Sequence, residues 1–130
     1  FYNIVITDSG TGLIHSAMGG ALESTRTLVI AGAPTVDGGS RASKTLDWLH
    51  AHGFDELAAD AVVVLSQDRS SREVDRDAIA AHFRQRCRAV VELPADPHLL
   101  TGGQIVFDRL RPRTRDAALQ IAAHVADQFG

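Results

Sequence analysis

Apolar residues along this chain gather in four short runs, each followed by polar or turn-forming residues. Every run is nearly continuous in hydrophobicity and rich in valine or isoleucine, which is typical of strands buried on both faces of a parallel sheet. The segments between the runs space their apolar residues three and four positions apart, as amphipathic helices do. The pattern predicts strands at residues 3–7, 27–33, 61–66 and 88–93, and helices at residues 14–24, 39–52, 71–86 and 114–129.

Alternating strands and helices of these lengths predict an α/β fold, with a mainly parallel sheet covered by helices on both faces. Ligands of such sheets bind beyond the carboxyl ends of the strands. Because proline, aspartate and serine also form ordinary turns, the strand ends are either a binding edge or simple turns, and both interpretations stay open. The four ends are Asp8-Ser9-Gly10, Pro34-Thr35, Ser66-Gln67-Asp68 and Pro94-Ala95-Asp96.

Composition narrows the class of protein. The 130 residues amount to one domain, and a net charge of -3 argues against nucleic acid held by bulk charge. Two arginine clusters, at residues 84–88 and 109–115, are interpreted as solvated faces. Cys87 is the single cysteine, so no disulfide can form within the chain and a reducing, cytoplasmic location is expected. No apolar run approaches the ~20 residues of a membrane span, so no membrane insertion is expected.

Four segments, in order, resemble the C-terminal half of a MinD/ParA-type ATPase, the group with a deviant Walker A loop. Tyr2 to Leu13 is similar to the family's switch II strand and glycine turn. Leu28 to Pro34 resembles the next strand, and Val62 to Asp68 the strand whose end often carries an asparagine for adenine. Val90 to Asp96 resembles the strand and Pro-x-Asp loop beside base and ribose. The resemblance implies that residues 1–130 are one domain, part of a three-layer P-loop sandwich that lacks its P-loop.

A narrower resemblance rests on two further segments. The helix with Ala42-Ser43-Lys44-Thr45-Leu46-Asp47-Trp48-Leu49 and the Asp96-x-His98-Leu99 turn look like those of actinobacterial MinD-like proteins. Some of these proteins are associated with type VII secretion. The resemblance therefore implies secretion or partitioning proteins as partners.

The family resemblance assigns roles to individual residues. Asp8 would orient the magnesium-bound water shell, and the backbone of Gly12 would lie near the γ-phosphate; these two are the candidate catalytic residues. Asp8 could instead cap the following helix. Asp68 stands where asparagine is common and can accept but not donate a hydrogen bond to adenine. The candidate nucleotide-binding residues are Ser9, Gly10, Thr11, Asp68, Pro94 and Asp96, with turn formation as the alternative for Asp68 and Asp96.

Lys44, the single lysine, lies in a stretch that nearly matches a phosphate-binding loop. Residues 38–45 would follow a strand, but Ser43 occupies the second glycine position, where a Cβ atom would crowd a phosphate. The apolar spacing also predicts that Lys44 lies within a helix. We therefore expect no phosphate loop here and no bound nucleotide in this chain by itself.

The resemblance implies that the complete protein binds Mg-ATP, dimerises around it and couples hydrolysis to positioning, partitioning or secretion-related assembly. This chain alone would then be inactive. The alternative is a non-hydrolysing α/β scaffold that keeps the fold for protein contacts. The sequence ahead of Phe1 separates the two, because an ATPase needs a glycine-rich loop with lysines there.

Overall fold

The computed structural model describes residues 17–68 and 72–127, so the strand predicted at residues 3–7 lies outside the described part. These described residues contain three strands: β1 (Val29–Gly32), β2 (Val62–Ser66) and β3 (Ala89–Leu93). The helices are α1 (Ala17–Ser24), α2 (Val36–Ala51), α3 (Asp55–Ala59), α4 (Glu73–Arg84), α5 (Pro97–Leu100), the 3-10 helix η1 (Phe107–Arg109) and α6 (Pro112–Ala126).

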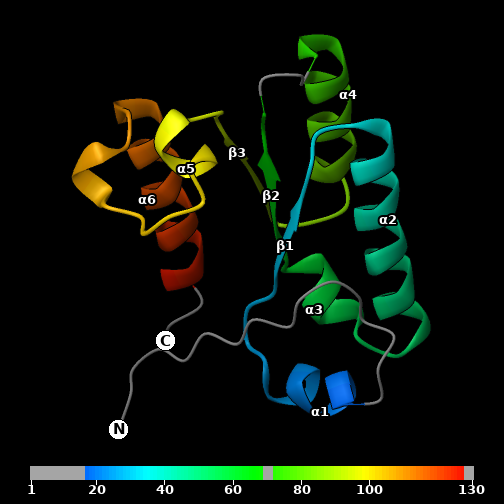
Figure 1. Ribbon diagram of the computed structural model, residues 1–130. Coiled ribbons are helices and arrows are strands. Elements are labelled where there is room, and N and C mark those ends of the chain that lie inside the picture. The colour runs from blue at the N-terminus through cyan, green and yellow to red at the C-terminus, as the bar shows by residue number, and fades with distance from the viewer. Residues whose placement is uncertain (1–16, 69–71, 128–130) are drawn as a thin grey trace, which may run out of the picture.

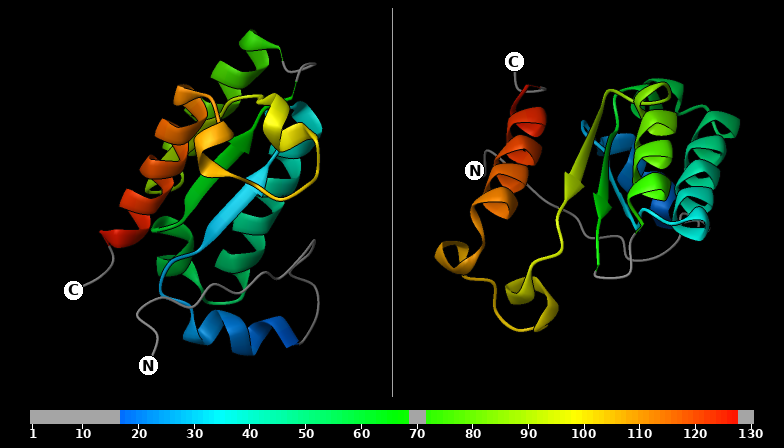
Figure 2. Two further views of the ribbon diagram at one scale, coloured as in Figure 1. Left: turned by 60° about the vertical axis from the view of Figure 1, so that its left-hand side comes forward. Right: turned by 90° about the horizontal axis from the view of Figure 1, so that it is seen from above.

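The three strands form one parallel sheet in the order β1-β2-β3. Val29 is in register with Val62, and Val62 with Ala89. Helices α2 and α4 cover one face of the sheet, while α6 lies on the other against β3 and β2 (Figures 1 and 2). The predicted α/β fold, with a parallel sheet and helices on both faces, is confirmed.

Each face of the sheet contributes to its own hydrophobic cluster. Alternate residues of β2 point to opposite faces, so Val63 and Leu65 pack with the α2 and α4 side chains Leu46, Leu49 and Phe83. The smaller cluster lies under α6 and contains Val62, Val64, Val91 and Ala117. Burial on both faces explains why β2 reads as an unbroken apolar run.

Helix α2 begins three residues earlier than predicted because Thr35 caps it. The Thr35 hydroxyl oxygen accepts a hydrogen bond from the backbone N–H of Gly38 at 3.0 Å, which satisfies one of the free donors of the first turn. The predicted end is confirmed: Gly53 follows with a φ of 83°, and the N–H of Phe54 donates to the carbonyl oxygen of Leu49 at 2.8 Å.

Some expectations differ from the structure. In α4, Ile79 and Phe83 pack against the core, whereas the apolar residues Val74 and Ala78 are exposed. Three short elements were not predicted, namely α3, α5 and η1. Each spans five residues or fewer, too short for a helical period to show in the sequence.

Candidate functional site

The carboxyl ends of the three strands lie at one edge of the sheet. Because the strands are parallel and in register, Gly32 of β1 pairs with Leu65, and Ser66 pairs with Leu93 of β3. Helix α2 begins at this edge, directly after β1, and α5 follows β3 there (Figure 1). In open α/β sheets this edge is where ligands bind, so it is the candidate site.

The start of α2 packs tightly against the end of β1. A Cβ atom on Gly38 would clash with the backbone carbonyl of Ala33, so only glycine fits at this position. This close approach brings the N–H groups of the first turn of α2 to the sheet edge. The negative charge of Asp37 in that turn disfavours the binding of an anion there.

Gln67 and Arg76 form the polar centre of the edge. The guanidinium Nη1 of Arg76, on α4, donates to the Gln67 side-chain oxygen at 2.7 Å, and the Gln67 backbone N–H donates to Leu93 at 2.9 Å. The Arg76 Nε is buried without a hydrogen-bond partner among the described residues. A guanidinium group at a strand end suits a carbonyl, carboxylate or phosphate oxygen, although a ligand can reach the buried Nε only after a neighbouring group moves.

Asp96 lies at the same edge but its carboxylate turns inward. It is 2% exposed, and its two oxygens accept from the backbone N–H groups of His98 and Arg111, each at 2.9 Å. These contacts lower the pKa of the Asp96 carboxyl, the Arg111 N–H most strongly, against the opposing effect of burial. The nearby Thr114 hydroxyl favours the charged form too, although its geometry falls short of a regular hydrogen bond. Asp96 thus has an observed structural role at the predicted nucleotide edge.

The other sequence-predicted site residues divide into two groups. Asp68 is exposed just beyond β2, and Pro94 is half-buried just beyond β3, so both lie at the candidate edge. The remaining candidates, Asp8, Ser9, Gly10, Thr11 and Gly12, lie outside the described residues.

Lys44 lies in the middle of α2 and is exposed, as the apolar spacing predicted, so residues 38–45 form no phosphate loop. Its neighbour Ser43 has its hydroxyl 3.0 Å from Nε2 of His82 on α4. This contact joins the two helices on the face away from the sheet edge.

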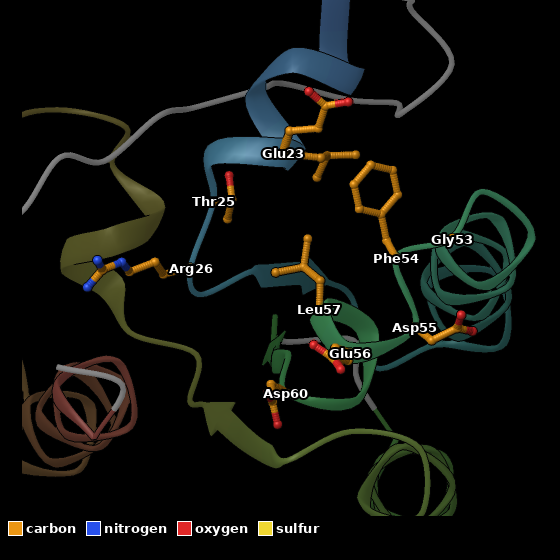
Figure 3. Close-up of a pocket in the computed structure, with 10 residues that line it drawn as sticks. Glu23, Thr25, Arg26, Gly53, Phe54, Asp55, Glu56, Leu57 and Asp60 are labelled. Carbon is orange, nitrogen blue, oxygen red and sulfur yellow. The ribbon is translucent and has the colours of Figure 1, made fainter. Parts of the chain in front are cut away.

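A wide hollow lies at the opposite, amino-terminal edge of the sheet. It measures about 670 Å³ and opens between the end of α1 and α3, with the Phe54 and Leu57 side chains toward its middle (Figure 3). None of the sequence-predicted site residues lines it, and its charge is mainly acidic. The lining residues are Leu22, Glu23, Thr25, Arg26, Gly53, Phe54, Asp55, Glu56, Leu57 and Asp60.

Residues 17–68 and 72–127 contain no group of three histidine, cysteine, aspartate or glutamate side chains that could hold a metal ion. Cys87 is half-buried and its Sγ contacts the carbonyl oxygen of Phe83 at 3.0 Å. Burial raises the pKa of the Cys87 thiol, which keeps it protonated at neutral pH.

Within residues 17–68 and 72–127, no helix has the length and hydrophobicity to cross a membrane.

The sequence predicts Gln67 only as part of a strand end, without a role of its own, and it does not predict Arg76 as a functional candidate. Gln67 directly precedes the predicted Asp68, so its position at a strand end was the available signal. Arg76 lies nine residues further on in a helix whose polar face carries several charges, and nothing in the pattern singled it out.

The chain is similar to a secretion-associated protein. It is 33% identical over 132 residues to the ESX-1 secretion-associated protein EspI from two strains of Mycobacterium tuberculosis, a match that covers 99% of this chain. The chain spans 20% of the length of these relatives. No family model matches the chain, and no solved structure gives a significant match.

Proposed function

We propose that this chain is the C-terminal portion of a MinD/ParA-like ATPase domain within a secretion-associated protein. The observation that carries the secretion part is the match to EspI along 99% of the chain. By this proposal the chain acts in type VII secretion, and its complete form binds and hydrolyses Mg-ATP as a homodimer to drive assembly with secretion proteins.

The nucleotide part of the proposal is supported by the candidate edge. Parallel strands end there together, the start of α2 lies beside β1, and the Arg76 side chain faces Gln67 with one donor unused. By this proposal Asp68 and Pro94, which follow β2 and β3, would line a base or ribose. Asp96, whose oxygens accept from backbone N–H groups, would shape the loop beside them. Asp8 would orient the magnesium-bound water, with Gly12 near the γ-phosphate.

The test is nucleotide binding by the full-length protein that contains this chain. We expect its sequence to have a glycine-rich loop with lysines ahead of Phe1, and we expect the protein to bind Mg-ATP in calorimetric titration. Asp8→Asn should lower the rate of ATP hydrolysis, whereas Asp60→Asn, at an exposed position on the opposite edge of the sheet, serves as a matched control. The 130-residue chain by itself should bind ATP more weakly than about 1 mM. A full-length sequence without such a loop, or equal rates of ATP hydrolysis by the two variants, would contradict the ATPase proposal.

A second candidate function is a non-hydrolysing scaffold for protein contacts. Two observations favour it. The single lysine, Lys44, lies in the middle of α2, where it forms no phosphate loop, and both Asp96 oxygens already accept hydrogen bonds from backbone N–H groups. In this case the full-length protein binds secretion proteins with the same affinity in the presence and in the absence of Mg-ATP.

A further inference from the structure

The segment from α5 to the start of α6 carries an unusual share of the exposed apolar surface. Four of the eight large hydrophobic side chains that are exposed in the described residues lie within residues 100–107. Their exposed fractions run from 40% to 62%. They are Leu100, Ile105, Val106 and Phe107. Exposed apolar residues that gather in one place often mark a contact site, whereas scattered ones are ordinary on protein surfaces.

Polar contacts at the base of the segment hold its backbone in place. The N–H of Val106 donates to Nε2 of His98 at 2.8 Å, and the Thr101 hydroxyl donates to the His98 carbonyl oxygen at 2.8 Å. Asp96 binds the backbone at both ends of the segment, through His98 and Arg111. The apolar side chains are therefore presented on an ordered backbone, which lowers the entropy lost on binding.

Three arginines follow the exposed apolar residues closely in the chain. Arg109, Arg111 and Arg113 are exposed, and their guanidinium groups make no ion pair within the described part of the chain. Asp108 is the one acidic residue between positions 100 and 113, so this stretch has a net charge of +2 in a chain whose net charge is -3. In Figure 1 the segment, yellow to orange, lies on the α6 side of the sheet, opposite α2.

We propose that residues 100–113 form a docking surface, the 100–113 surface, for an acidic segment of a partner protein that also carries apolar side chains. Apolar side chains would fill the space around Ile105 and Phe107, and carboxylates would pair with the arginines. Aromatic and arginine side chains are the residues enriched at protein interfaces. This surface goes beyond the proposed ATPase function, because its contacts require no nucleotide.

An acidic protein segment fits this surface better than an anionic bilayer does. The guanidinium fork matches the two oxygens of a carboxylate, and the apolar side chains are about half covered, so they do not project as a membrane anchor must. The overall charge of -3 also repels an anionic membrane. The 100–113 surface is thus assigned to protein, with lipid binding as the competing outcome of the test.

The test is selection of peptides from a random dodecamer display library on the purified chain, followed by fluorescence-polarisation titration of the enriched peptides. We expect the enriched peptides to combine acidic and apolar residues. The double variant Phe107→Ser, Arg109→Glu should bind them roughly thirtyfold more weakly, the effect expected of hot-spot residues. The matched control Val74→Ser, Arg41→Glu changes one exposed apolar residue and one exposed arginine elsewhere, and should bind like the parent chain.

Three results would overturn the proposal. The first is a set of enriched peptides with no acidic bias, and the second is equally tight binding of these peptides to the parent chain and to the Phe107→Ser, Arg109→Glu variant. The third is binding of the parent chain to phosphatidylglycerol vesicles, with loss of that binding in the same variant and no peptide enrichment. Far-UV circular dichroism of each variant establishes that it is folded, and both substitutions lie at exposed positions, where the fold tolerates change.

Discussion

The carboxylate of Asp96 accepts a hydrogen bond from the backbone N–H of Arg111, fifteen residues further along the chain, at 2.9 Å. The same carboxylate accepts from the N–H of His98 in the first turn of α5. One side chain therefore joins the end of β3, the start of α5 and the start of α6. The position of α6 on the sheet depends on this junction.

Replacing Asp96 by alanine should lower the thermal stability of the chain. Asp96→Ala leaves the N–H groups of His98 and Arg111 without their acceptor, and the loss of an N-cap alone costs a domain of this size about 5 °C in Tm. Asp108→Ala removes an exposed carboxylate nearby and is the matched control. Equal Tm values for the two variants in thermal circular dichroism would show that the junction adds no stability.

The stabilising effect of Asp96 should depend on pH. Its pKa is lowered from an ordinary value of 3.8 because the folded protein hydrogen-bonds the charged form, chiefly through Arg111. A carboxyl group with a lower pKa in the folded state stabilises the protein above its unfolded pKa, and loses this effect as the pH falls through the folded pKa. Urea titrations should give a constant stability difference between the parent chain and Asp96→Asn from pH 7 to about 5. That difference should shrink below about pH 4; a difference that grows there contradicts the assignment.

Gly38→Ala should destabilise the fold through a backbone clash. The added Cβ meets the carbonyl group of Ala33, which cannot move without shifting the end of β1, and overpacking of this kind costs about 2 kcal/mol. Gly20→Ala is a fitting control, because a Cβ there meets no atom within 4 Å and alanine is the better helix former in α1. The free energy of unfolding from urea titration should fall for the first variant and hold or rise for the second. A stable Gly38→Ala chain would mean that α2 can move away from β1.

His98→Ala should loosen the segment that precedes α6. Without Nε2 as acceptor, the N–H of Val106 loses its hydrogen bond, and its hydrogen-exchange rate should rise roughly tenfold. Gln104→Ala changes an exposed side chain in the same segment and should leave that rate unchanged. Exchange measured by NMR at the Val106 amide separates the two variants. An unaltered rate in His98→Ala would show that the segment is held by other contacts.

The sequence predicts the helices and strands that are long enough for their hydrophobic pattern to show. The predicted range of β2 agrees with the structure within one residue because its side chains are buried on both faces. The range predicted for α2 rests on helical spacing, and Ala42, Leu46 and Leu49 are the buried residues at that spacing. Gly53 ends that helix for a local reason, its positive φ, which glycine tolerates best. Such features depend on neighbours along the chain, so the sequence reveals them.

The candidate site depends on contacts that local patterns do not encode. The pairing of Arg76 with Gln67 joins side chains nine positions apart in the chain, and the Asp96–Arg111 contact joins groups fifteen positions apart. A strand-end aspartate looks the same in sequence whether it faces a ligand or a backbone N–H group. Only the fold distinguishes these environments, so Asp96 was predicted as a nucleotide contact while its observed partners are structural.

The strand order β1-β2-β3 in the sheet is also the order of the strands in the chain. Among the described residues, β2 therefore pairs with β1 and β3 with β2, so each of these strands joins the one that precedes it in the chain. Each pairing closes a single strand–helix–strand unit, in which the paired residues Val29 and Val62 lie 33 positions apart and Val62 and Ala89 lie 27 apart. During synthesis β1, α2 and β2 can associate before β3 and α6 leave the ribosome, which limits how long the apolar strands are available for aggregation.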